Sequence, residues 1–274
     1  WCLVGSEMCI RDSNRPADRT DDFNELSARA GISTTLDSIN YFAQISLGFR
    51  PPQINEAYRL QKKQNVTDLD SETLTMFEFG SKFELESLMG SLSFYQSKKK
   101  NSIFRDSQNF IVDNGKTDHK GVELSLSIFV NLRNTINANI TYGDHRYDFE
   151  TDTSMREKIR VDNKIDTAPK IMANLLWNIN LNDDSNLSLE IEHMDSYYTD
   201  AANLHEYEGH TLYHARFNRE FSESLKGYLR IENLTDKRYA ERADFNAFGG
   251  DRYFPGLPRE VYCLLYTSDA ADEV

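Results

Sequence analysis

The sequence predicts an all-β protein, an antiparallel up-and-down transmembrane β-barrel fragment of about 10–11 strands. Three observations predict this fold class. Apolar and polar residues alternate along most of the chain, and the links between the alternating segments are short and long in turn. In addition, no run of about 18 apolar residues offers a membrane-spanning helix, which agrees with the mean hydropathy of −0.62.

The two ends of the chain resemble translated sequencing adapter. A DNA string that can encode residues 263–268 contains a stretch whose reverse complement can encode residues 8–12. Two distant peptides related in this way are improbable as biology, so segments 1–13 and 263–274 are excluded from fold reasoning. All three cysteines lie in these ends. The remaining insert, 14–262, has 249 residues, no cysteine and a net charge of −9, and we expect both of its ends to be cuts through a longer gene.

Each expected strand shows a period of two, with one apolar face. In 39–50, for example, Tyr41, Ile45 and Phe49 share a face, while Gln44 and Arg50 lie on the other. In chain order the alternation covers 26–32, 41–49, 77–83, 88–94, 122–130, 136–142, 171–181, 187–191, 213–221 and 225–231, and a further strand begins near residue 259.

The links support an up-and-down order. The short polar turns are expected at 37–38, 84–87, 131–134, 182–186 and 222–224. The long charged loops are expected at 51–72, 105–118, 149–165, 199–209 and 240–258. A regular short-long rhythm places all turns at one end of a meander and all loops at the other, which soluble sandwiches rarely sustain over ten strands.

Strand length and aromatic residues favour a barrel in a membrane. The strands are expected to run about 11–15 residues, whereas soluble strands usually have about 5–6 and a tilted membrane strand needs about 9–11. Aromatic residues gather near the expected strand ends, where interfacial girdles lie. These are Tyr95, Tyr142, Trp177, Tyr197, Tyr198 and Tyr239. The polar face, rich in Asn, Ser and Glu, would line a wide lumen.

Several motifs are better explained by architecture than by chemistry. Pro51-Pro52 ends a strand because proline has no N–H to donate, and 233–236, Gly249-Gly250 and Pro255-Gly256 are turn clusters. His205 and His210 are five residues apart across a glycine, so loop histidines are favoured over a zinc site.

The remaining motifs do not predict an enzyme, a metal site or a nucleic-acid partner. Segment 113–118 resembles a calcium loop but lacks its later ligands, and no nucleophile–base pair is recognisable. Lys98–Lys100 is either a solvated rim or a contact for lipopolysaccharide phosphates. The excess of Asp and Glu (44) over Lys and Arg (31) argues against nucleic acid as a partner.

Five segments, in order, resemble those of TonB-dependent outer-membrane receptors. They are GFRPPQINEAY (48–58), LDSETLTMFEFGSK (69–82), HKGVELSLS (119–127), ENLTDKRY (232–239) and RYFPGLPREVY (252–262). Ser71 stands where the family usually has Pro, and Phe77 replaces Tyr. The resemblance implies a 22-stranded barrel closed around an N-terminal plug, with this chain forming the C-terminal half. It also implies the outer membrane of a Gram-negative bacterium, with lipid and lipopolysaccharide around the barrel and energy supplied by the TonB complex through the plug.

The resemblance further implies a transporter of a ferric siderophore or similarly large nutrient, with no resident cofactor. Such ligands are captured by aromatic and cationic groups at loop ends and in the lumen. The candidates are Arg146, Tyr147, Tyr197, Tyr198, His205, Tyr207, Arg252 and Tyr253, of which Tyr198, His205 and Arg252 are favoured. Siderophore, haem, cobalamin, oligosaccharide and metal chelates all stay open as substrates. The alternatives are a passive porin-type channel barrel and a soluble all-β carbohydrate-active enzyme.

Overall fold

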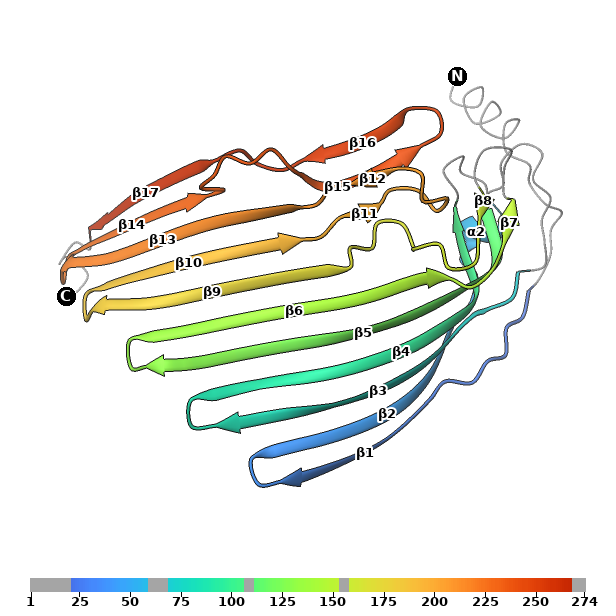
Figure 1. The fold of residues 1–274 in the computed structure, drawn as a ribbon, viewed down its shortest axis with the longest axis horizontal. Coiled ribbons are helices and arrows are strands. Elements are labelled where there is room, and N and C mark those ends of the chain that lie inside the picture. The colour runs from blue at the N-terminus through green and yellow to red at the C-terminus, as the bar shows by residue number, and fades with distance from the viewer. Residues whose placement is uncertain (1–20, 59–68, 106–110, 153–157, 268–274) are drawn as a thin grey trace, which may run out of the picture.

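The computed structural model describes residues 21–58, 69–105, 111–152 and 158–267. Its main sheet has eleven antiparallel strands in chain order (Figure 1). They are β1 (Ala28–Leu36), β2 (Ile39–Arg50), β3 (Glu72–Leu85), β4 (Leu88–Arg105), β5 (Ile111–Asn131), β6 (Asn134–Tyr147), β9 (Ile171–Asn182), β10 (Ser185–Met194), β13 (His210–Ser222), β14 (Leu225–Glu232) and β17 (Glu260–Thr267). The predicted fold class and the up-and-down order are confirmed.

All short connections lie at one end of the sheet, here called the turn end, and all long ones at the opposite loop end (Figure 1). The five predicted turns are confirmed, and each leaves two residues between its strands. The turn from β1 to β2 includes Asp37, whose φ of 53° lies in the left-handed region that aspartate tolerates. Strand β2 ends at Arg50, directly before Pro51, as predicted.

Strand register carries the sequence alternation across the whole sheet. Ile45 lies opposite Phe77, and both are about half exposed on what we call the apolar face. Gln44 lies opposite Glu78 on the polar face, and their side chains are hydrogen bonded. Similar polar pairs recur along the sheet: Ser125–Asn139, Ser127–Asn137, Asn174–Glu190, Ser188–Asn178 and Asn218–Asn186. An exposed apolar face opposite a hydrogen-bonded polar face suits a barrel wall between lipid and a wet lumen.

The buried apolar residues of the described chain, except Ala138 in the wall, gather at the loop end. Small elements form there: α2 (Ile54–Tyr58), β7 (Thr151–Asp152), β8 (Lys158–Ile159), β11 (Tyr197–Tyr198), β12 (Glu206–Tyr207), β15 (Ala240–Asn246) and β16 (Gly250–Pro255). Three clusters pack among them, around Ile103, Ile159 and Ala243. The loops therefore form a packed layer on top of the wall. No helix among the described residues is long and apolar enough to cross a membrane.

The expected loop at 105–118 is wrong in its extent. Strands β4 and β5 continue into it, reaching 18 and 21 residues instead of the expected 11–15. Pairing persists through Ser102–Gly115 and Phe104–Val112, so the segment 113–118 that resembles a calcium loop is mostly extended strand. Near the end of this pairing, Phe104 packs on Tyr147 of β6, with ring centroids 5.8 Å apart.

The predicted aromatic girdle is confirmed only in part. Tyr142 and Trp177 lie on the apolar face and are exposed. Tyr95 instead lies opposite Glu78 on the polar face, and its ring covers Gly121. Tyr197 is buried in the loop layer, and Tyr239 packs there against Gly256. The expectation failed for Tyr95 because proximity to a strand end does not specify the face. It failed for Tyr197, Tyr198 and Tyr239 because these residues lie in the loop layer and not in a strand of the main sheet.

The sheet is open. Within the described residues, β1 pairs only with β2, and β17 pairs only with β14. Residues 263–267 continue β17, and Cys263 lies opposite Leu229. The origin of 263–274 stays a prediction, and residues 1–13 lie outside the described residues.

Candidate functional site

Two small hairpins at the loop end are joined by tyrosines. Tyr197 and Tyr207 pair across β11 and β12, with their ring centroids 5.4 Å apart. The Tyr197 hydroxyl accepts a hydrogen bond from the Ala243 N–H (2.8 Å) and donates one to the Ala243 carbonyl (3.3 Å). The Tyr207 hydroxyl accepts one from the Ala240 N–H (3.0 Å). Burial raises the pKa of the Tyr197 phenol. These two candidate residues thus fasten the β11–β12 hairpin to the β15–β16 hairpin.

Three further candidates lie on the solvent side of the same assembly. His205 stacks on Phe245, with centroids 3.8 Å apart, and its Nδ1 lies 3.3 Å from the Asp251 carboxylate. Tyr253 is 56% exposed, and Arg252, the residue before it, lies on the opposite face of β16. The structure therefore brings together residues from 197–207 and from 252–253, which are about 50 positions apart in the chain.

Arg252 belongs to a surface that the sequence did not reveal. The buried Asp244 carboxylate lies between two guanidinium groups, 2.6 Å from Arg252 and 3.1 Å from Arg242. Arg242 also lies over the Phe254 ring, 5.6 Å from its centroid. Register places these four residues, here called the arginine face, on one side of β15–β16. Both arginine side chains are more than half exposed, so the face presents cations beside an aromatic ring.

Tyr198 lies between this assembly and the preceding loop. The Lys164 ammonium is 5.8 Å from the centroid of its half-buried ring, and its carbonyl accepts the Thr167 N–H at 2.8 Å. One residue further on, the Thr199 carbonyl accepts the Phe245 N–H at 3.0 Å. Tyr198 therefore sits where three loop segments meet.

Arg146 and Tyr147 lie at the loop end of β6. Lys164, which forms a β-bridge with Arg146, also lies over the Tyr198 ring, and Tyr147 packs in one cluster with Ile159 and Ala201. Tyr147 is buried beside Ile159 and donates a hydrogen bond to Asp166 at 2.7 Å. Arg146 points to the opposite face and pairs with Asp144 at 3.0 Å. The role predicted for these two residues in ligand binding stays a prediction.

The buried carboxylate of Glu72, at the start of β3, binds groups from β2 and β4 at the loop end. Glu72 accepts hydrogen bonds from the Ile103 N–H (2.8 Å) and from the Arg50 Nε (2.5 Å), and the Lys99 ammonium lies 2.9 Å from it. Burial alone would raise the pKa of the Glu72 carboxyl, but these hydrogen bonds, chiefly that of Arg50, hold it below its usual value. Lys99 is therefore an internal ion-pair partner, which corrects the description of Lys98–Lys100 as a simple rim.

The histidines form one close pair. His119 and His145 are neighbours across β5 and β6, with their Nδ1 atoms 2.9 Å apart, and Thr117 lies 2.8 Å from the other ring nitrogen of His119. Nowhere in the described ranges do three or more His, Cys, Asp or Glu side chains gather as a metal site.

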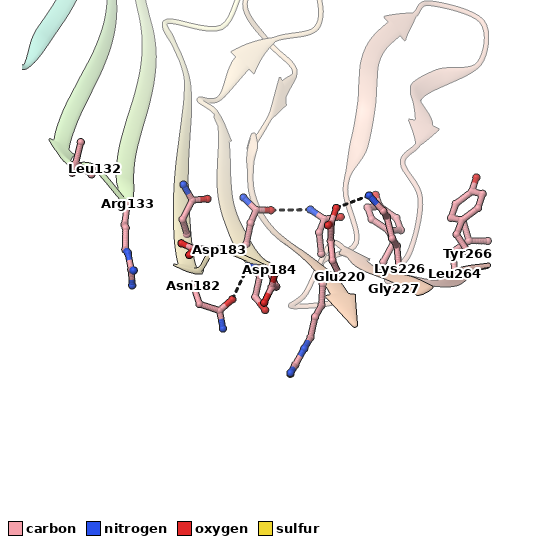
Figure 2. Close-up of a pocket in the computed structure, with 16 residues that line it drawn as sticks. Leu132, Arg133, Asn182, Asp183, Asp184, Glu220, Lys226, Gly227, Leu264 and Tyr266 are labelled. Atoms are coloured by element: carbon pink, nitrogen blue, oxygen red, sulfur yellow. Dashed lines mark hydrogen bonds and ion pairs between the residues drawn. The ribbon is translucent and has the colours of Figure 1, made fainter. Parts of the chain in front are cut away.

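A cavity of about 1060 Å³ lies at the turn end (Figure 2). Polar pairs line it, including Lys226–Glu220 at 2.6 Å and Asn218–Asn186 at 2.8 Å. One wall is formed by Leu264 and Tyr266, which belong to the segment that resembles adapter. We therefore build no site on this cavity.

These features define a class, the wall of a transmembrane β-barrel whose packed loops lie at one end. The chain belongs to the TonB dependent receptor-like β-barrel family, whose family model matches residues 11–234. Three of the five segments noted above fall within that match; 232–239 begins inside it and extends past its end, and 252–262 lies beyond it. No curated protein sequence matches the chain.

Solved structures share the fold at low sequence identity. The ferric-catecholate import receptor Fiu of E. coli K12 is 18% identical, with a TM-score of 0.67, and the match covers 87% of this chain and 34% of Fiu. The siderophore receptor PiuA of Acinetobacter baumannii is 19% identical (TM-score 0.73; 88% and 36%). The ferric yersiniabactin uptake receptor FyuA of Yersinia pestis is 15% identical (TM-score 0.69; 87% and 36%). The chain thus spans about a third of these proteins, all of them transport receptors.

Proposed function

We propose that the chain is part of an outer-membrane receptor of a Gram-negative bacterium that binds and imports a ferric siderophore or a similar large, scarce nutrient. The family supports energisation through TonB, acting on a plug domain outside this chain. The open edges at β1 and β17 fit a wall that further strands complete. The ligand would be cargo, with no resident cofactor and no catalysed reaction.

The observation that carries the proposal is the arginine face. Two guanidinium groups, supported by a shared buried carboxylate, remain more than half exposed beside Phe254. Ferric chelates built from carboxylate or catecholate groups are large anions with flat faces. Guanidinium groups bind such oxygens through paired charged hydrogen bonds, and an aromatic ring adds stacking area. His205 and Tyr253 lie on the opposite face of the β15–β16 hairpin.

Binding and uptake of ferric chelates by the complete receptor, produced in a host without its own receptors, test this proposal. Replacing Arg242 and Arg252 with Gln should weaken binding about tenfold or more, since each charged hydrogen bond contributes about 1.5–3 kcal/mol. Arg219→Gln is the matched control, because Arg219 lies over Phe221 at the turn end. Wild-type binding by the double variant would contradict the site, and a wild-type receptor that takes up no chelate would contradict the function.

Dependence on TonB separates this proposal from the passive porin-type alternative. In a host that lacks TonB, the receptor should still bind the chelate at the cell surface but should not import it. Continued import in that host would favour a passive channel.

A further inference from the structure

A pocket of about 340 Å³ lies on the polar face near the loop end, across β6, β9, β10 and β13. Elsewhere on this face, hydrogen-bonded pairs of Asn, Ser and Glu recur. The pocket lining differs, because it contains two methionines, Met172 and Met194, together with His210. We call these three residues the thioether row. The row belongs to the wall, whereas the arginine face belongs to the β15–β16 hairpin of the loop layer.

Strand register places the thioether row on three neighbouring strands of the main sheet (Figure 1). Met172 lies opposite Met194 across β9 and β10, and Met194 lies opposite His210 across β10 and β13. Residues directly opposite each other have Cα atoms about 4.5–5.5 Å apart, and their side chains on one face are neighbours. Two thioethers and one imidazole are therefore within reach of a single ion.

Two tyrosines of the loop layer hold the His210 ring. Its Nδ1 lies 2.9 Å from the Tyr207 hydroxyl, and its centroid lies 4.7 Å from that of Tyr239. A histidine that binds a metal through one ring nitrogen commonly donates the other N–H to a neighbouring group, which fixes the tautomer and the orientation of the ring. Tyr207 is such a neighbour for Nδ1, so Nε2 is the nitrogen that can bind an ion.

The two methionines differ in how firmly they are held. Met194 is half-buried and packs against the cluster that contains Tyr197 and Tyr207. Met172 is 45% exposed, although its side chain is apolar. Methionine is unbranched and has three rotatable bonds, so the exposed thioether can adjust to an ion that the packed thioether and the imidazole hold.

The composition of the pocket favours a soft cation. Among the described residues that line it there is one carboxylate, Glu192, whose side chain is 49% exposed, and there is no lysine or arginine. Thioether sulfur selects soft ions such as Cu(I), whereas carboxylate, carbonyl and water ligands suit Mg²⁺ and Ca²⁺. Zn²⁺ is bound by Cys, His and carboxylate ligands. Two thioethers in a set of three therefore suit a soft monovalent ion better than Zn²⁺.

We infer that the thioether row binds one soft monovalent metal ion, of the Cu(I) class, on the lumen side of the wall. The inference goes beyond the proposed chelate import, because neither its residues nor its donor atoms are those of the arginine face. The lumen side of a barrel wall is polar and wet, so a hydrated ion reaches Met172 without crossing lipid. The competing explanation is that the methionines only cover apolar surface beneath the loop layer, and it predicts no metal binding by them.

The test titrates the complete receptor, in detergent and chloride-free buffer, with silver nitrate in a calorimeter. Ag⁺ is the probe because it is soft, monovalent and stable in air. The double variant Met172→Leu and Met194→Leu keeps two apolar side chains of similar volume. It should bind Ag⁺ at this site about tenfold more weakly or worse, since even groups that only support a metal ligand change metal affinity about 10–100-fold. His210→Gln should weaken the same binding.

The matched control is the double variant Met76→Leu and Met89→Leu. These two thioethers also lie on the polar face, but their cross-strand partners are serines and Glu84, so this variant should bind Ag⁺ as the wild type does. A wild-type circular dichroism spectrum confirms that each variant is folded.

Three results would overturn the inference. They are wild-type Ag⁺ binding by the Met172→Leu and Met194→Leu variant, an equal loss in the control variant, and displacement of the bound Ag⁺ by equimolar Zn²⁺. Because chelate uptake is measured separately and depends on the arginine face, failure here is distinguishable from failure of the transport proposal.

Discussion

Arg50 and Glu56 form a two-point ion pair, with nitrogen–oxygen distances of 3.0 and 3.1 Å. Glu56 also accepts the Gln53 N–H at 2.7 Å, which caps the first turn of α2. The Arg50 Nε reaches the buried Glu72 at the start of β3. The segments 48–58 and 69–82 therefore meet at this arginine, so their resemblance to receptor segments has a structural reason.

Glu72→Gln should destabilise the loop end. Glutamine keeps the shape of the Glu72 side chain but leaves Arg50 and Lys99 without their shared negative partner. Because both cations are about a third exposed, solvent reduces the cost, and we expect a loss of about 1–3 kcal/mol in the free energy of unfolding. Urea unfolding in detergent, followed by circular dichroism, measures it. Glu84→Gln, an exposed residue at the turn end of β3, is the control; an equal loss there would contradict a specific role for Glu72.

The same carboxylate should make stability depend on pH. Its pKa is lower in the folded protein than the ordinary value of 4.5, so the unfolded chain binds its proton first. The stabilisation is therefore fully present above about pH 4.5 and is lost as pH falls through the lower folded pKa. Unfolding measured between pH 3 and pH 7 should show a steeper acid loss in the wild type than in Glu72→Gln. Parallel curves would contradict this assignment.

The strands of the wall were predictable because the alternation of their side chains depends only on residues that are close in the sequence. A side chain in a strand alternates with its neighbours, so a wall between lipid and lumen shows a period of two wherever it crosses the membrane. Beyond the regular wall, charged and polar residues interrupt the alternation in β4 and β5, which is why 105–118 was expected to be a loop. The arginine face was not predictable, because Arg242 and Phe254 meet only through the register of a hairpin. Strands of two residues, such as β11 and β12, carry no periodic signal at all.

Asn233 should be the most sensitive position in the segment ENLTDKRY. It is 2% exposed and has a φ of 49°, which asparagine tolerates better than most residues. Its amide donates to the carbonyls of Lys237 and Leu257 and accepts the Lys237 N–H. Asn233→Ala should cost about 2–4 kcal/mol by leaving these groups unpaired in a strained backbone. Thr235→Ala, in the same turn, is the control. A difference of less than about 0.5 kcal/mol between the two variants in urea unfolding would contradict the prediction.

Gly256 permits the Tyr239 ring to lie against the backbone. A Cβ at position 256 would lie 2.1 Å from that ring, and the Gly256 N–H donates to the Tyr239 carbonyl at 3.0 Å. The ring is also packed 4.7 Å from that of His210, so it cannot move freely. We therefore expect Gly256→Ala to lower the free energy of unfolding by about 1–3 kcal/mol through overpacking.

A double-mutant cycle tests the cause of that loss. Tyr239→Ala has its own cost, because it removes a packed ring. It also removes the atoms that the new methyl group would strike, so the double variant should lose less stability than the sum of the two single variants. The difference between the loss in the double variant and the sum of the two single losses is the energy of the clash, because the other effects of each substitution cancel in the cycle. Strictly additive losses would show that alanine at 256 acts on the backbone alone and that the tyrosine ring does not require glycine at this position.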